Sequence, residues 1–135
     1  MIPRYTLAEM AAIWSDEARF GAMLRVELAV ARAQVRRGQV PPDALIAMER
    51  RARVDVERIA ELERTTDHDV IAFVSQVAEA VGPEGRYLHL GLTSSDVVER
   101  SRMAAARARS GSERSRNIAN AETPCDRKAR ITKTT

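Results

Sequence analysis

The side chains best suited to proton transfer and anion binding are two histidines and a run of hydroxyls. His68 stands within the segment Thr66-Asp67-His68-Asp69, and His89 comes shortly before the run Thr93-Ser94-Ser95-Asp96. Both segments have the form of a helix start, where unpaired N–H groups and the helix dipole favour an anion. Asp69 could orient the His68 imidazole. The pattern predicts a phosphate or carboxylate site, although each segment alone would also serve as a plain helix cap.

Arg4 and Tyr5 add a fixed cation and a phenol near the chain start, and both groups bind phosphate or carboxylates. Taken alone, Arg4 is equally consistent with a solvated charge. The sequence contains one cysteine, Cys125, and two histidines. A structural zinc site needs several such ligands, so no metal is expected, and Cys125 is interpreted as a passive thiol.

The elements expected to position these groups are helices. Ser15 and Asp55 have the character of N-terminal caps, and Pro42 can open a helix. Gly38 and Gly82 fit positions just past helix ends. Three further helical features are a Thr6–Glu9 capping box with a helix over about 7–13, a second capping box at 66–69, and one apolar face formed by Phe20, Leu24, Leu28, Ala31 and Val35.

Residues 83–92 are predicted to form a loop in which Tyr87, Leu88 and Leu90 could make a brief extended segment. No repeated strand pattern occurs elsewhere, so the fold class is predicted to be all-α. Hydrophobic residues make up 44% and charged residues 30% of the 135 residues, a balance typical of soluble globular proteins. No stretch approaches the ~18 apolar residues of a membrane span, and no secretory signal is recognised. We therefore expect a cytoplasmic protein with no membrane partner.

Charge divides the chain into two parts. Residues 1–99 contain 12 arginines and 16 carboxylates, whereas residues 100–135 contain 10 basic and 3 acidic side chains. Residues 101–135 also contain no leucine, valine or aromatic residue. We predict a helical domain over 1–99, some helix near 95–109, and a basic, disordered tail. A reading-frame change, a truncated gene or a fusion would explain the tail.

Several blocks of residues 1–99 together resemble bacterial adenylosuccinate lyases of the fumarase/aspartase superfamily. The blocks are Arg4-Tyr5 followed by E-M-A-A-I-W-S at 9–15, V-D-V-E-R-I at 54–59, T-D-H-D-V at 66–70 and R-Y-L-H-L-G-L-T-S-S-D-V-V at 86–98. The spacing between the blocks also fits. The resemblance implies a β-elimination that releases fumarate from adenylosuccinate, giving AMP, and from the related imidazole-carboxamide ribotide. It implies a homotetramer and no metal or organic cofactor.

The same resemblance implies roles for individual residues. Arg4 and Tyr5 would contact the nucleotide phosphate, which His89 would help to hold. His68 would assist at the reacting end of a nucleotide pocket lined by Asp67, His68 and Asp69. Thr93 and Ser94 would hydrogen-bond the succinyl carboxylates, because hydroxyls and helix-start N–H groups stabilise such charge.

This sequence departs from the family pattern in two ways. Similar proteins carry a basic residue where this chain has Asp67, and an acid there would repel an anionic substrate. The family's acid lies in a G-R-T-H motif and its base in a serine loop, and neither motif occurs in these 135 residues. We therefore expect no measurable turnover from this chain alone, because each placed proton-transfer group contributes ~10²–10⁴ in rate.

Two other interpretations stay open. One is a different lyase of the superfamily, such as argininosuccinate lyase or a carboxymuconate cycloisomerase. The other is a non-enzymatic helical interaction protein whose basic tail touches nucleic acid. No aromatic residue is interleaved with the arginines of the tail, so stacking on bases has no support and nucleic-acid binding is not expected.

Overall fold

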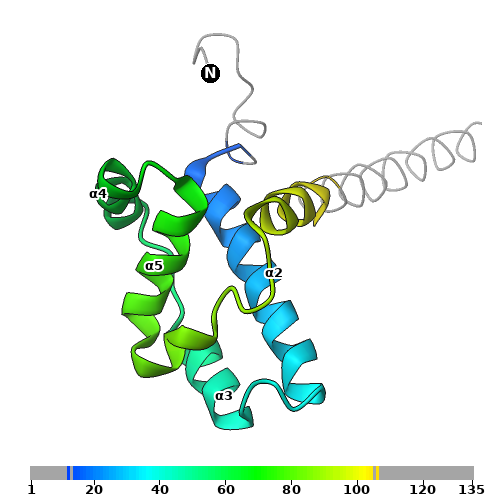
Figure 1. Cartoon of the computed structure of the whole chain (residues 1–135). Coiled ribbons are helices and arrows are strands. Elements are labelled where there is room, and N and C mark those ends of the chain that lie inside the picture. The colour runs from blue at the N-terminus through cyan, green and yellow to red at the C-terminus, as the bar shows by residue number, and fades with distance from the viewer. Residues whose placement is uncertain (1–11, 13, 105, 107–135) are drawn as a thin grey trace, which may run out of the picture.

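The computed structural model describes residues 12, 14–104 and 106, and within these residues every regular element is a helix. The elements are α2 (Asp16–Arg36), α3 (Pro42–Arg51), α4 (Val56–Thr66), α5 (Asp69–Val81) and the short 3₁₀ helix η2 (Pro83–Tyr87). A further helix begins at residue 94 and is described through residue 104. The all-α prediction is confirmed for this part of the chain (Figure 1).

Local capping determines where most of these helices begin and end. The Ser15 side chain accepts the Ala18 N–H before α2, and the Asp55 side chain accepts the Arg58 N–H before α4. Pro42 occupies the first position of α3, where its missing N–H costs nothing. Gly38, just past α2, has φ 71°, a left-handed conformation that glycine adopts without strain. These boundaries confirm the sequence predictions.

The predicted capping box at 66–69 is wrong in register. Thr66 is the last residue of α4, and its hydroxyl donates to the Leu62 carbonyl at 3.1 Å. Asp67 then turns the chain with φ 49°, and His68 caps α5. The T-x-x-D pattern was correct about a helix start but could not show which residue takes the left-handed conformation.

The predicted loop at 83–92 is partly helical. Pro83–Tyr87 forms η2, and Leu88–Gly91 forms turns, so the suggested extended pairing of Tyr87, Leu88 and Leu90 is absent from this described segment. Gly85 explains the close approach of η2 to α5. A Cβ at this position would lie 2.7 Å from the Cα of Ala78, so only glycine fits without a shift. η2 thereby delivers the chain from the end of α5 to the turn that contains His89.

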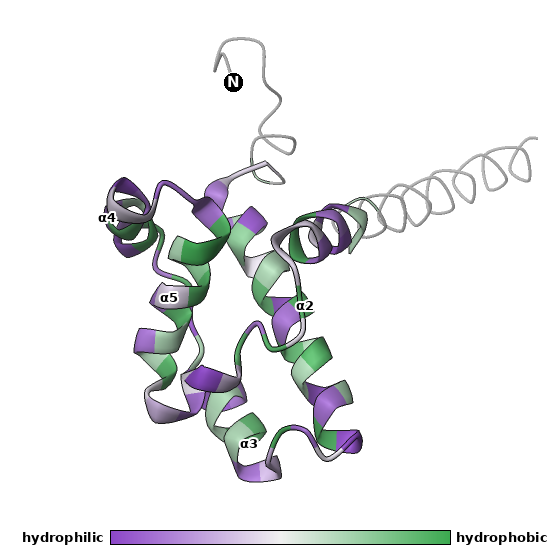
Figure 2. Cartoon of the chain, in the orientation of Figure 1, coloured by the Kyte–Doolittle hydropathy of each residue, from purple (hydrophilic) through white to green (hydrophobic). Residues whose placement is uncertain are grey.

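The core is shared by the described helices, and one aromatic pair joins α2 to α5 within it. The rings of Phe20 and Phe73 stack with centroids 5.7 Å apart, and both side chains are buried. Met48, Ile59 and Val97 bring α3, α4 and the 94–104 helix into the same core cluster. Figure 2 shows α5 as largely hydrophobic along its length, whereas α2 alternates between hydrophobic and hydrophilic residues.

Several predictions fall outside the described residues. These are the helix over about 7–13 (apart from Ala12, which is helical), the end of the helix predicted near 95–109, the disordered basic tail, and Cys125. The domain boundary near residue 99 stays a prediction. No helix among the described residues is long and apolar enough to cross a membrane.

Candidate functional site

His68 is held at the entrance of α5 by the helix itself. Its backbone is extended, with φ −150°, and its Nδ1 accepts the N–H of Ile71 at 3.4 Å. Asp69 Oδ1 is 3.7 Å from the same nitrogen, which is outside hydrogen-bonding distance, so the helix N–H orients the ring instead of the expected carboxylate. Because Nδ1 acts as an acceptor, the neutral ring carries its hydrogen on Nε2.

Nε2 of His68 points at the next helix start. It lies 3.4 Å from the Oγ of Ser94, which is 26 residues further along the chain. Ser94 is the first residue of the 94–104 helix, where backbone N–H groups lack partners within the helix. The structure thus brings together the imidazole and the hydroxyl that the sequence analysis selected separately.

Thr93 and Asp96 form a reciprocal cap on the same helix start. The Thr93 hydroxyl donates to Asp96 Oδ2 at 2.7 Å, and the Thr93 N–H donates to the same oxygen at 3.1 Å. The Asp96 N–H in turn donates to Thr93 Oγ1 at 3.3 Å. In this arrangement the hydroxyl hydrogen of Thr93 is already used, so Thr93 caps the helix here, whereas the Ser94 hydroxyl faces His68.

This cap changes the acidity of Asp96. Hydrogen bonds from the hydroxyl and then the N–H of Thr93 lower the pKa of the Asp96 carboxyl, and the charges of Arg100 and His89 lower it further by smaller amounts. A depressed pKa in the folded chain means that the ionised carboxylate stabilises the fold above the ordinary Asp pKa of about 3.9. That contribution is lost as the pH falls through the lower, folded value.

We therefore expect a carboxyl carbon NMR titration to place the Asp96 midpoint below that of an ordinary aspartate. Thr93→Val removes the donor hydroxyl and should move the midpoint upward. Thr65→Val, at an exposed position of α4, is the matched control and should leave the midpoint unchanged. An Asp96 midpoint at the ordinary value in the unmodified chain would contradict the cap described above.

His89 is fixed by a buried carboxylate on α2. Glu27 Oε1 lies 2.8 Å from His89 Nδ1, and Glu27 Oε2 accepts the His89 N–H at 2.9 Å. The Glu27 side chain is 2% exposed and the His89 side chain 25% exposed. His89 also has φ 59°, an uncommon conformation for a residue with a side chain, and these two bonds help to stabilise it.

A second buried polar residue of α2 holds the same turn. Gln34 Nε2 donates to the Leu90 carbonyl, one residue after His89. Gln34 lies seven residues after Glu27, so both side chains leave nearly the same face of α2. The turn at 88–91, with Gly91 at φ 69°, is therefore fixed against α2 at two adjacent points.

The remaining candidates are differently placed. Asp69 lies close to His68 and pairs with Arg19 of α2, whose Nη1 is 3.3 Å from Asp69 Oδ2. Asp67 is exposed at the end of α4, and its carboxylate accepts no hydrogen bond from any of the described residues. Arg4 and Tyr5 lie outside the described residues. The structure thus brings the start of α5 to the start of the 94–104 helix, and it fixes the 88–91 turn against α2.

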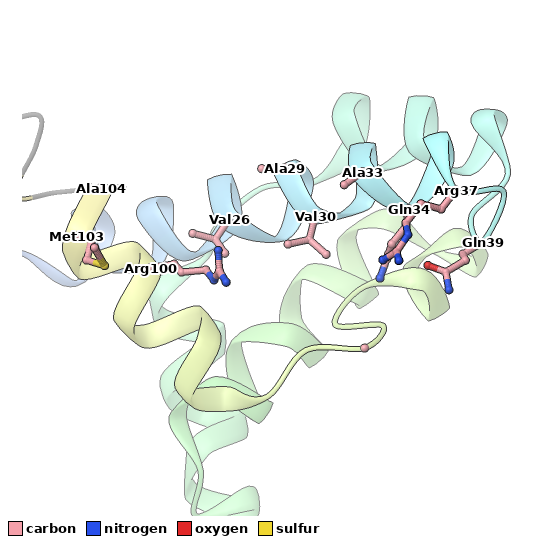
Figure 3. Close-up of a pocket in the computed structure, with 11 residues that line it drawn as sticks. Val26, Ala29, Val30, Ala33, Gln34, Arg37, Gln39, Arg100, Met103 and Ala104 are labelled. Atoms are coloured by element: carbon pink, nitrogen blue, oxygen red, sulfur yellow. The ribbon is translucent and has the colours of Figure 1, made fainter.

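A groove of about 920 Å³ lies between α2 and the 94–104 helix (Figure 3). In the close-up, Val26 and Val30 project from α2 and Arg100 reaches toward Val26 from the neighbouring helix. The lining contains no histidine, aspartate or glutamate, and neither His68 nor Ser94 contributes to it. The groove therefore has no imidazole or carboxylate that could accept a proton, and it is separate from the contact between His68 and Ser94.

Comparison with known sequences decides the family. No family model matches the chain. Adenylosuccinate lyase of Aquifex aeolicus is 53% identical over 102 residues, and that of Bacillus subtilis is 46% identical over 99 residues. Each match covers 73% of this chain and 23% of the relative. The matched residues belong to the adenylosuccinate lyase family. The chain spans about a quarter of the length of these relatives, which are carbon–nitrogen lyases.

Solved structures agree with this family. A 3-carboxy-cis,cis-muconate lactonizing enzyme from Pseudomonas putida is similar with a TM-score of 0.69 and 32% identity, covering 77% of this chain and 25% of that one. A fumarate lyase from Mesorhizobium sp. gives a TM-score of 0.68 and 26% identity, covering 74% and 24%. The helices described above are therefore arranged as in part of a fumarase/aspartase superfamily lyase.

Proposed function

We propose that this chain supplies part of the substrate site of an adenylosuccinate lyase, an enzyme that eliminates fumarate from adenylosuccinate and from the related imidazole-carboxamide ribotide. The contact between His68 Nε2 and Ser94 Oγ carries the proposal, because it joins an imidazole and a hydroxyl from two separate helix starts. Family membership of the matched residues supports the choice of substrate.

In this proposal the two helix starts receive the charged succinyl group. The Ser94 hydroxyl and neighbouring N–H groups hydrogen-bond a carboxylate, while His68 presents an N–H to the reacting end. Thr93 contributes through the cap that holds Ser94 in place. His89, fixed against α2, offers its second ring nitrogen to the nucleotide phosphate, with Arg4 and Tyr5 proposed as further phosphate contacts.

Asp67 and Asp69 are proposed to border the nucleotide pocket rather than to contact the anion. Asp69 is paired with Arg19, which offsets its charge next to His68. Asp67 has no such cation among its described partners, so it would weaken binding of an anionic substrate. The assembled enzyme is proposed to be a cytoplasmic homotetramer, and the 135-residue chain alone is proposed to lack turnover.

The test is a chimaera in which residues 1–99 replace the corresponding segment of the Aquifex aeolicus relative. We expect the purified chimaera to release fumarate from adenylosuccinate, and the 135-residue chain to release none above background. The unmodified relative is the reference for both measurements. A chimaera that assembles as the relative does but releases no fumarate would contradict the proposed substrate site. Turnover by the isolated 135-residue chain would contradict its proposed inactivity.

A second candidate is a lactonizing or cycloisomerase reaction on a carboxymuconate. The observation that favours it is the similarity to the Pseudomonas putida enzyme, whose sequence is 32% identical in the superposed region. The higher identity to adenylosuccinate lyases favours the nucleotide substrate. Supplying the chimaera with both substrates discriminates, since only a carboxymuconate-specific site would leave adenylosuccinate untouched.

A further inference from the structure

Glu27 is a buried carboxylate whose hydrogen bonds, as far as the described residues show, all go to one residue. Its two oxygens accept from the backbone N–H and from the ring of His89, 62 residues away. The side chain is 2% exposed and lies in α2 among core residues such as Met23 and Ala31. Burying a carboxylate is costly unless it is paired and hydrogen-bonded, and His89 supplies both hydrogen bonds here.

The geometry determines where the hydrogen sits on the His89 ring. An ionised carboxylate can only accept, so the 2.8 Å contact requires the hydrogen on Nδ1. Nε2 is then the atom left for a ligand. His68 has the opposite arrangement, because its Nδ1 accepts a backbone N–H. The two histidines are therefore held as different tautomers by different partners.

We infer that Glu27 is a positioning residue, which holds the His89 ring with Nδ1–H toward α2 and Nε2 toward the anionic group of the substrate. The direction of the ring and its tautomer follow from the contacts above; the identity of the anion as a nucleotide phosphate rests on the proposed function. When Nε2 also carries a hydrogen, the ring donates one hydrogen bond to Glu27 and one to the anion. The carboxylate then balances the charge of the ring.

The Gln variant of this residue has a specific expected consequence. In Glu27→Gln only one of the two terminal atoms can accept. The buried His89 N–H needs that acceptor, which leaves the amide NH₂ to donate to Nδ1. The ring hydrogen must then move to Nε2. The substitution keeps the shape of the side chain while it reverses the tautomer.

Ring nitrogen NMR on the 135-residue chain measures the tautomer directly. The chain has two histidines, so His68→Gln assigns the remaining ring signals to His89. We expect Nδ1–H in the unmodified chain and Nε2–H in Glu27→Gln. Glu49→Gln is the matched control, since Glu49 is an exposed glutamate that also bonds a residue of α2, Arg32, at 2.7 Å. It should leave His89 unchanged.

An Nε2–H tautomer for His89 in the unmodified chain would overturn the inference, and this measurement does not depend on whether a variant folds. Titration with AMP then separates the two proposals. We expect AMP to shift the His89 Nε2 signal. We expect Glu27→Gln to weaken AMP binding about 10-fold or more, because the amide no longer stabilises the doubly protonated ring that donates to the phosphate. Equal AMP affinity in both forms despite a reversed tautomer overturns the positioning role. An Nδ1–H tautomer without any AMP shift rejects the proposed phosphate contact and leaves the positioning of His89 by Glu27 supported.

Discussion

Replacing His68 by alanine in the chimaeric lyase is expected to lower turnover of adenylosuccinate by about 10²–10⁴-fold, the usual contribution of one placed proton-transfer group. The expectation follows from the position of Nε2, which carries the ring hydrogen and faces Ser94 at the joint between two helix starts. An N–H group at this position can donate a hydrogen bond or a proton to the negative charge that develops on the substrate. The measurement is the rate of fumarate release at saturating substrate.

The same substitution also removes a helix cap, and the two effects must be separated. His68 Nδ1 accepts the Ile71 N–H, and loss of such a cap costs about 1 kcal/mol of stability. His68→Asn keeps an oxygen that can cap α5 but cannot transfer a proton. We therefore expect His68→Asn to retain the melting temperature of the parent while it loses turnover as alanine does. Full turnover in the folded Asn variant would show that His68 acts only as a cap.

The helix boundaries could be predicted because their causes lie within a few residues. The side chains of Ser15 and Asp55 bond N–H groups three residues ahead, and Pro42 acts at its own position. The register error at Thr66 has the opposite origin. The choice between Thr66 and His68 as the cap depends on Asp67 adopting φ 49°, a conformation that the T-x-x-D pattern does not specify.

The buried face of α2 was only partly predictable for a related reason. Phe20 and Ala31 are buried as the apolar stripe predicts, whereas Leu24, Leu28 and Val35 are only half-buried. The face is centred instead on Met23, Glu27 and Gln34. Two polar residues belong to it because their partners lie in the 88–91 turn, 62 and 56 residues away. A glutamate four residues from both Met23 and Ala31 was the available signal, but spacing alone could not identify its partner.

For the site, the residue types alone selected His68 and Ser94 separately and did not predict that they lie close together. His68 and Ser94 were each compatible with an ordinary cap, and the resemblance to a family joined them into one pocket. The structure places them 3.4 Å apart. The ligand roles of these and the other selected residues stay predictions. Thr93 was selected as a carboxylate ligand, and in the structure its hydroxyl hydrogen is donated to Asp96.

Phe73→Ala is expected to have the largest effect on stability, a loss of about 3–5 kcal/mol in the free energy of unfolding. The Phe73 side chain is 1% exposed and stacks on Phe20 of α2, so its removal leaves a cavity between α2 and α5. A domain of this size has about 5–15 kcal/mol in total, so the variant should be near its unfolding threshold at room temperature. Urea unfolding followed by circular dichroism measures the difference.

Ile71→Ala, two residues earlier on α5, is the matched control because Ile71 is 49% exposed, and we expect a change within about 0.5–1 kcal/mol. The comparison also tests how the site is held. α5 carries His68 at its start and is fixed to α2 through Phe73, while α2 holds His89 through Glu27. When Phe73→Ala unfolds, we therefore expect His68 and His89 to lose their distinct tautomers, as measured by their ring nitrogen NMR signals. If instead Phe73→Ala and Ile71→Ala have the same free energy of unfolding, the Phe20–Phe73 stack does not fix α2 and α5 relative to each other.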